Sequence, residues 1–130
     1  MEIKHINKIQ AIIFKNLGFN EPVNYFYIKG DSNIRYACNY HNFNASEEFI
    51  SAPSLYEIQQ WLMKHKHINI IPHYIKDMFY TCKVYYYTKD NNMHVINVEH
   101  APYRYDFRTY NEALLAGIEV TIKLINILPD

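Results

Sequence analysis

Hydrophobic positions near the end of the chain recur every three or four residues, which is the period of an α-helix. The small and apolar positions of this stretch are Ala113, Leu114, Gly117, Ile118, Thr121, Ile122, Leu124, Ile125 and Leu128. Before them, Thr109 and Glu112 have the spacing of a capping box, in which each side chain bonds the other residue's backbone N–H. Pro129 ends the pattern. We therefore predict a closing helix over 109–128.

Gly117 lies in the middle of this predicted helix, where glycine costs about 1 kcal/mol relative to alanine. Ala113 is four residues earlier and therefore lies on the same side of the helix. Together the two residues form a smooth strip. We expect this strip to let the helix approach a β-sheet closely.

Two further helices are predicted. In residues 3–17 an apolar stripe is formed by Ile6, Ile9, Ile13 and Leu17, and Gly18 follows as a left-handed end residue. The second helix begins near Ser54, because Ser54 and Glu57 repeat the capping-box spacing. Its apolar face contains Leu55, Ile58, Trp61, Leu62 and His65.

The remaining segments are rich in strand formers. Residues 23–29 and 34–40 flank a turn and predict a hairpin, followed by a polar surface loop over 41–52. Further strands are predicted at 68–75, with Pro72 indicating an edge position or a bulge, and at 79–88, 93–99 and 103–107.

The predicted order is α-β-β-α-β-β-β-(β)-α, which indicates the α+β class, with an antiparallel sheet covered on one face by helices. A chain of 130 residues has the length of a single domain, 1–130. Within it, 1–44 forms an amino-terminal helix with its hairpin, and 54–128 forms an αβββα core.

Strand 79–88 has two different faces. Cys82 and Val84 lie on its better core face, whereas Lys83, Tyr85 and Tyr87 lie on the opposite face. An exposed aromatic face can bind a protein partner or stack on a planar ligand. The alternative is that the early hairpin or a second subunit covers it. The predicted binding residues are Lys83, Tyr85 and Tyr87, with Arg104 and Arg108 as added cations.

Charge and composition narrow the function classes. The chain has 13 basic and 13 acidic residues, so no net field attracts nucleic acid or anionic lipid. No apolar run reaches membrane-spanning length, and no signal peptide is evident, so we expect a protein of a reducing cytoplasm. Its two cysteines, Cys38 and Cys82, are expected to be free thiols in that compartment, although the sequence leaves a disulfide open.

Side chains that could carry catalysis are scattered. His65, His67 and His73 lack the spacing of metal ligands, and no acidic residue is placed to join them. Cys82 lies among apolar neighbours, so it is expected to be a buried small hydrophobe without nucleophilic activity. We therefore predict no metal, no cofactor and no enzymatic activity.

Three segments together carry a resemblance. They are the helix end Leu17-Gly18-Phe19, the segment from Ala52-Pro53-Ser54 to Gln60-Trp61-Leu62, and the closing segment 107–117, FRTYNEALLAG. The chain resembles a family of small uncharacterised proteins of Bacteroidetes and their phages, which show an "APT…L..WLRE" helix and a closing "F.TYEEALE.GL" helix. Met63-Lys64 and Leu115 depart from those motifs. The resemblance implies a fold and a phage or bacterial setting, and no activity.

The element order of 54–128 also resembles that of the double-stranded-RNA-binding domain. That domain has a lysine cluster at the start of its last helix, where it contacts phosphates. Here the same position reads Thr109-Tyr110-Asn111-Glu112, with an acidic residue in place of the lysines. We therefore do not expect double-stranded RNA to be a partner.

The sequence thus predicts a small non-enzymatic interaction or accessory protein, which binds a protein partner or itself through the aromatic sheet face. The first alternative is a protein that binds and sequesters a small ligand or nucleotide. The second is binding of single-stranded nucleic acid, which would depend strongly on salt.

Overall fold

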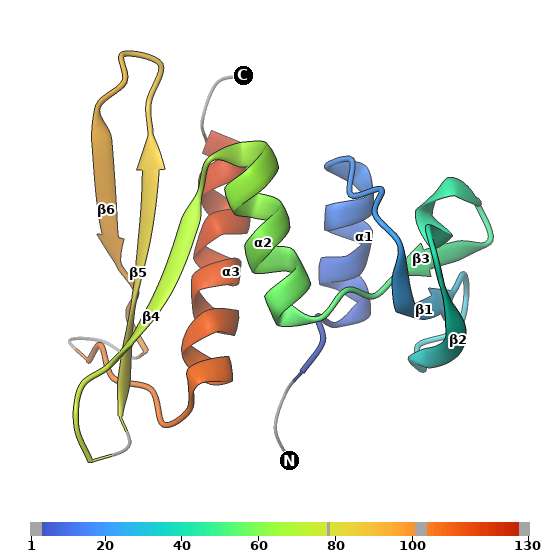
Figure 1. Ribbon diagram of the computed structural model, residues 1–130, viewed down its shortest axis with the longest axis horizontal. Coiled ribbons are helices and arrows are strands. Elements are labelled where there is room, and N and C mark those ends of the chain that lie inside the picture. The colour runs from blue at the N-terminus through green and yellow to red at the C-terminus, as the bar shows by residue number, and fades with distance from the viewer. Residues whose placement is uncertain (1–3, 78, 101–103, 128–130) are drawn as a thin grey trace. The chain divides into compact units, whose positions relative to one another are not determined.

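The computed structural model describes residues 4–77, 79–100 and 104–127, and it divides within one helix into two compact units, Lys4–Glu57 and the part from Ile58 onward. In chain order the elements are α1 (Lys8–Asn16), β1 (Val23–Ile28), β2 (Arg35–His41), the 3-10 helix η1 (Phe43–Ala45), β3 (Phe49–Ser51), α2 (Leu55–Lys66), β4 (Asn69–Tyr74), β5 (Tyr80–Tyr87), β6 (Met93–Asn97) and α3 (Tyr110–Ile127) (Figure 1). The α+β class is confirmed, and the elements follow the predicted order with one additional strand, β3, before α2. The strands form two three-stranded antiparallel sheets, β2-β1-β3 and β4-β5-β6, where a single sheet was predicted.

Helix α1 is closed at both ends by local hydrogen bonds. Asn7 and Gln10 form a capping box, with side-chain to backbone distances of 2.8 and 3.0 Å. At the other end Gly18 adopts φ +98°, and the Phe19 N–H donates to the Phe14 carbonyl at 2.9 Å. This pattern is a Schellman motif, so the left-handed end residue predicted at Gly18 is confirmed.

The apolar stripe predicted for the first helix is wrong. The helix begins at Lys8, so Ile6 lies outside it, and Ile9 is 72% exposed. The buried positions are instead Gln10, Ala11 and Phe14, the last of which has the largest apolar side chain of the helix. Burying one phenyl ring removes more apolar surface from water than burying one isoleucine, so the helix turns that face to the core.

The loop predicted over 41–52 is also wrong, because this segment contains η1 and β3. The buried ring of Phe43 stacks on Phe26 with ring centroids 4.3 Å apart. Asn44 donates to the Phe19 carbonyl at 2.8 Å and accepts from the Ser51 N–H at 2.8 Å. The polar side chain thus satisfies backbone groups that a surface loop would expose to water.

The second unit is a sheet with a helix on one face. Figure 1 shows α3 alongside β4 and β5, the two strands that it packs against. Its other helix, α2, starts in the first unit, where Ser54 and Glu57 form the predicted capping box at 2.8 and 3.1 Å. Strand β4 is an edge strand, which is one of the two alternatives that Pro72 indicated. The apolar core of this unit consists of Ile58, Trp61, Leu62, Ile68, Ile70, Cys82, Val84, Val98, Phe107, Ala113, Leu114, Ile118 and Leu124.

Helix α3 begins as predicted, with one difference. The Glu112 N–H donates to Thr109 Oγ1 at 3.0 Å, which confirms the cap. The Glu112 carboxylate, however, accepts from the Arg108 N–H at 3.2 Å instead of the Thr109 N–H. Thr121 is buried in the helix face and is satisfied by the Gly117 carbonyl at 2.8 Å. No helix of the described residues is long and apolar enough to cross a membrane.

Gly117 is the point of closest approach between α3 and the sheet. A Cβ atom at this position would lie 2.4 Å from Ile70 Cγ2 and 2.8 Å from Cys82 Sγ. Distances this short are forbidden by van der Waals repulsion, so only glycine fits between the helix and these two strands. The packing role predicted for the Ala113 and Gly117 strip is confirmed.

The last strand, predicted over 103–107, is not continuous in the described residues 104–107, which have isolated bridge positions at Arg104 and Phe107. Phe107 and Tyr80 exchange two backbone hydrogen bonds of 2.7 Å each. Tyr103 lies outside the described residues, as do Leu128 and Pro129 at the end of the predicted helix. The bridge places the start of α3 next to the start of β5.

Replacing Gly117 with alanine should destabilise the protein. Alanine favours a helix interior by about 1 kcal/mol, but forcing a methyl group into a filled core costs typically ~1–3 kcal/mol. We expect Gly117→Ala to lower the free energy of unfolding measured in urea. In an Ile70→Ala background the penalty should shrink, because the closest atom has been removed. Glu119→Ala, on the exposed side of α3, is the control. Equal stability of Gly117→Ala and the natural protein would contradict the packing role.

Candidate functional site

Strand β5 separates a core face from an open face. Cys82 and Val84 are buried, with 1% and 0% of their surface exposed, on the side covered by α3. Side chains alternate along a strand, so Lys83, Tyr85 and Tyr87 point to the other side. The core face predicted from the sequence is confirmed.

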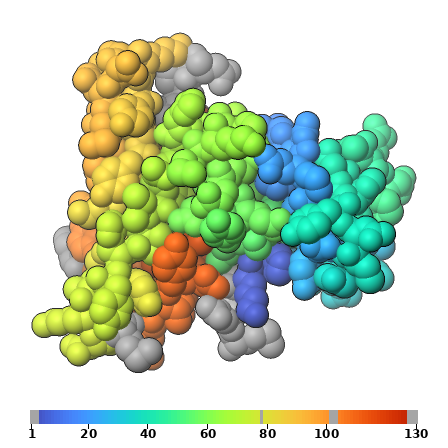
Figure 2. All heavy atoms as spheres, in the orientation of Figure 1, coloured from blue at the N-terminus to red at the C-terminus, as the bar shows by residue number. Residues whose placement is uncertain are grey.

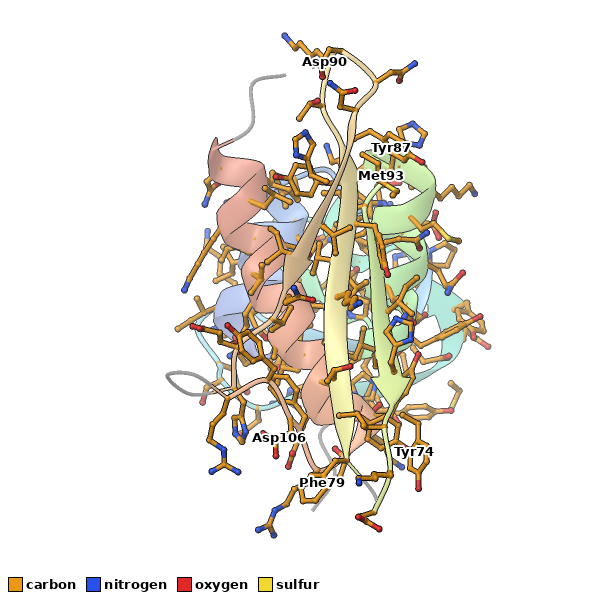
Figure 3. The ribbon with its side chains drawn as sticks, turned by 90° about the vertical axis from the view of Figure 1, so that its left-hand side faces the viewer. Tyr74, Phe79, Tyr87, Asp90, Met93 and Asp106 are labelled. Atoms are coloured by element: carbon orange, nitrogen blue, oxygen red, sulfur yellow. The ribbon has the colours of Figure 1, made fainter. Side chains whose placement is uncertain are left out.

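The register of the sheet shows which side chains share the open side. Tyr87 lies opposite Met93 and Tyr85 opposite Val95, while Lys83 stands between Ile71 and Asn97. Figure 3 looks onto this side, with Tyr87 and Met93 close together and α3 behind the sheet. We call this surface the open sheet face and define it by Ile71, Lys83, Tyr85, Tyr87, Met93 and Val95.

Large apolar side chains on the open sheet face are accessible to solvent. Tyr87 is 56% exposed, Met93 57% and Val95 44%. Tyr85 and Lys83 are half-buried between their neighbours on the adjacent strands. The face therefore combines an accessible apolar area with the hydroxyl groups of two tyrosines and one ammonium group.

Arg104 and Arg108, the two cations predicted to join this face, lie at the far end of the sheet. Arg104 pairs with Asp106 at 3.5 Å, and Asp106 directly precedes Phe107, the bridge partner of Tyr80. Tyr80 and Tyr87 are the two ends of β5, about 23 Å apart at a rise of ~3.3 Å per residue. Asp106 and Tyr87 accordingly lie at opposite ends of the sheet in Figure 3. Of the predicted residues, the structure brings together Lys83, Tyr85 and Tyr87 only.

Met93 and Val95 were not among the predicted site residues. They are in β6, a strand whose sequence alternates weakly between apolar and polar residues, so it did not show which side is exposed. The signal that could have found them is the hairpin register. The turn Lys89-Asp90-Asn91-Asn92 fixes Tyr87 opposite Met93, which transfers the face of β5 to β6.

A second feature lies where Tyr87 meets the β5–β6 turn. A hollow of about 540 Å³, which we call the tip hollow, is lined by Lys66, His67, Tyr87, Thr88, Lys89 and Asn91. The Lys66 ammonium lies 5.9 Å from the centroid of the Trp61 ring. In the adjoining turn, the Thr88 hydroxyl donates to the Asp90 carboxylate and lowers the pKa of that carboxyl. An aromatic ring and two ammonium groups thus share one hollow.

A groove in the first unit also carries lysines. It has a volume of about 590 Å³ and is lined by Lys8, Ile12, Lys15, Lys29, Gly30, Glu47 and Ile50. The Lys15 ammonium donates to the Ser46 and Phe49 carbonyls, each at 2.7 Å, so it holds the β3 segment against α1. Its position is explained by packing, and Glu47 offsets part of the remaining positive charge.

The histidines do not form a metal site in the described part of the chain. Within residues 4–77, 79–100 and 104–127, no group of three or more His, Cys, Asp or Glu side chains is placed to hold a metal ion. The His65 ring lies 5.6 Å from the Trp61 ring, and His67 adopts φ +55° beyond the end of α2. The two residues therefore have different environments.

The two cysteines are both free thiols with opposite exposure. Cys38 is exposed on β2, whereas Cys82 is buried under α3. Burial disfavours the thiolate and raises the pKa of Cys82 to about 12. Cys82 is therefore a neutral thiol at physiological pH, and this protonation state suits its packing role.

No family model matches the chain, and no curated protein or solved structure matches it. The resemblance to the Bacteroidetes and phage family, and the weaker one to the double-stranded-RNA-binding domain, therefore stay predictions.

Thiol labelling should separate the two cysteines. In the native protein at pH 8, a maleimide reagent should modify Cys38 and leave Cys82 unmodified, because Cys82 is both buried and protonated. Cys38→Ser should show no rapidly labelled thiol until denaturant is added. Mass spectrometry of the labelled peptides gives the readout. Rapid labelling of Cys82 in the native state would show that α3 does not shield it.

Proposed function

We propose that the protein is a small interaction module and that its open sheet face binds a protein partner. The observation that carries this proposal is the accessible group of Tyr87, Met93 and Val95 on one side of a sheet whose strands β4 and β5 pack against α3 on the other side. Contiguous exposed apolar side chains on a small domain are commonly used for binding.

The chemistry of the face supports a protein partner. Tyrosine and methionine are enriched at the centres of protein interfaces, because they provide apolar area and adapt to the opposing surface. On this side of the described strands, Lys83 is the one residue with a formal charge, either positive or negative. The partner surface that fits is therefore apolar at its centre, with a carboxylate placed to meet Lys83.

The proposal gives this face a binding role and no reaction. Its tyrosine hydroxyls and the Lys83 ammonium can donate hydrogen bonds to a partner. The strand's thiol, Cys82, points to the opposite side and is buried. We further propose, from the resemblance, that it is a phage or bacterial accessory protein that acts in the cytoplasm.

Two pairs of tyrosines allow a matched test. We expect Tyr85→Ala/Tyr87→Ala to weaken partner binding at least tenfold, since losing an interface anchor costs about 1–2 kcal/mol or more. The control is Tyr36→Ala/Tyr40→Ala on β2, whose rings are 61% and 69% exposed. Partners recovered from a lysate of the source cells are identified by mass spectrometry, and the affinity is then measured with the purified partner. Equal binding by both double variants would contradict the proposal.

A second candidate function is binding of a small anionic ligand at the tip hollow. The observation that favours it is the placement of Tyr87 beside Lys66 and Lys89. A planar base can stack on a tyrosine ring while lysine ammonium groups meet phosphate charge. This candidate replaces the cation set predicted from the sequence, since Arg104 and Arg108 lie at the other end of β5.

A panel of nucleotides tests the ligand candidate by thermal shift. A ligand at one hundred times its Kd stabilises the folded state by about 2.7 kcal/mol, so a binder raises the melting temperature. Lys66→Gln and Lys89→Gln should each reduce the shift, while Lys64→Gln, an exposed lysine in the same helix that does not line the hollow, should not. A flat response across the panel would exclude the nucleotides tested.

A further inference from the structure

The two edges of the β4-β5-β6 sheet differ in the backbone groups that they leave unpaired. At one end of the β5–β6 ladder the Thr88 N–H donates to the Asn92 carbonyl at 3.1 Å, and at the other the Val98 N–H donates to the Cys82 carbonyl at 3.0 Å. Bonding direction alternates along an antiparallel pair. The even-numbered residues of β6 therefore face β5. The odd-numbered residues Met93, Val95 and Asn97 direct their N–H and C=O groups outward.

The same alternation shows that the β4 edge is blocked. The odd residues of β5 face β4, so Ile70, Pro72 and Tyr74 are the outward residues of that strand. Pro72 has no N–H to offer a further strand. The Ile70 carbonyl is already taken, because Gln59 Nε2 of α2 donates to it at 2.7 Å. A further strand along β4 would therefore lack a donor at Pro72 and would have to displace the hydrogen bond from Gln59.

The β6 edge carries none of the usual protection. Natural edges are guarded by lysine, proline or an inward charge, which stop a second strand from adding. Met93–Asn97 contains no proline and no formally charged residue. The space-filling view shows β6, in orange, at the outer margin of its unit (Figure 2).

We propose that a second copy of this chain adds to the β6 edge, with the two β6 strands antiparallel about a twofold axis at Val95. The product is a continuous six-stranded sheet. This inference goes beyond the proposed function and does not rest on it, because backbone groups of the edge make the hydrogen bonds between the two copies whether or not the open sheet face binds a partner.

The strand is self-complementary in this register. Val95 opposes Val95 of the second copy, and Met93 opposes Asn97, so every outward residue of β6 meets an outward residue. Full overlap forms about six backbone hydrogen bonds, two for each opposed pair. His94 then opposes Ile96, and no formal charge opposes another charge.

Charges on the neighbouring strand also suit a second copy. In the dimer, opposed side chains form rows that run across the strands of both copies. One row consists of Lys83 and Asn97 of one copy followed by Met93 and Tyr87 of the second copy. The two Lys83 side chains therefore fall in different rows and do not repel each other closely. The central row joins Tyr85 and Val95 of one copy to the same residues of the other, so apolar side chains meet across the junction.

Proline scanning of the edge tests the pairing. Val95→Pro removes an outward N–H that β5 does not use, as Pro72 does naturally in β4, so the monomer should fold. In sedimentation velocity over a concentration series, the natural protein should rise from 15.6 kDa toward twice that mass, and Val95→Pro should stay at one copy. Tyr87→Ser, which alters the open sheet face and leaves the edge intact, should associate like the natural protein.

Charge pairs provide a test that does not depend on proline. Val95→Lys and Val95→Glu should each be monomeric, because like charges oppose at the twofold axis, and an equimolar mixture should form a heterodimer. In hydrogen exchange, the amides of Met93, Val95 and Asn97 should become protected as concentration rises, while His94 and Ile96 are protected throughout.

The outcomes separate this inference from the proposed function. No association of the natural protein at any concentration overturns the edge pairing and leaves the open sheet face untouched. Association that survives Val95→Pro, or that disappears in Tyr87→Ser without protection of the outward amides, also overturns it and assigns self-association to the face. Loss of partner binding in Tyr85→Ala/Tyr87→Ala with dimerisation intact supports both proposals.

Discussion

The close approach of α3 to the sheet at Gly117 determines how the second unit is organised. The helix backbone comes so near that a single methyl group would collide with Ile70 and Cys82. That contact selects the side of β5 that is buried, and because side chains alternate, it also selects the side that is left open. The accessibility of Tyr85 and Tyr87 is thus a consequence of a glycine on a different element.

The same contact governs the chemistry of the buried polar groups. Cys82 lies under the helix, where burial keeps its thiol protonated. The Thr121 hydroxyl donates a hydrogen bond to the Gly117 carbonyl within α3. The Cys82 thiol is neutral and the Thr121 hydroxyl is hydrogen-bonded, so neither group needs a ligand. We therefore assign this side of the sheet a structural role. The binding that we propose therefore uses the opposite side of the sheet and the ends of its strands.

Patterns that depend on local spacing were predictable, and those that depend on distant partners were not. The caps at Ser54 and Thr109, the left-handed Gly18 and the small strip at Gly117 all follow from residues within one or two turns. Strand β3 was missed because three residues are too few to show a period, and its pairing with β1 comes from elsewhere in the chain. Arg104 and Arg108 were misplaced toward the tyrosines because proximity in sequence does not show which end of a strand a segment meets.

Strand geometry links the open sheet face to the β6 edge. In an antiparallel strand, both the direction of the side chain and the direction of the backbone hydrogen bonds alternate with period two. On β6 the residues with open-face side chains, Met93 and Val95, are therefore also the residues whose backbone points outward. On β4 the residues whose backbone points outward have their side chains on the core face, as the buried Ile70 shows. Pro72 and the hydrogen bond from Gln59 therefore block this edge. A strand added at β6 thus extends the open sheet face, and one added at β4 would have to disturb the core.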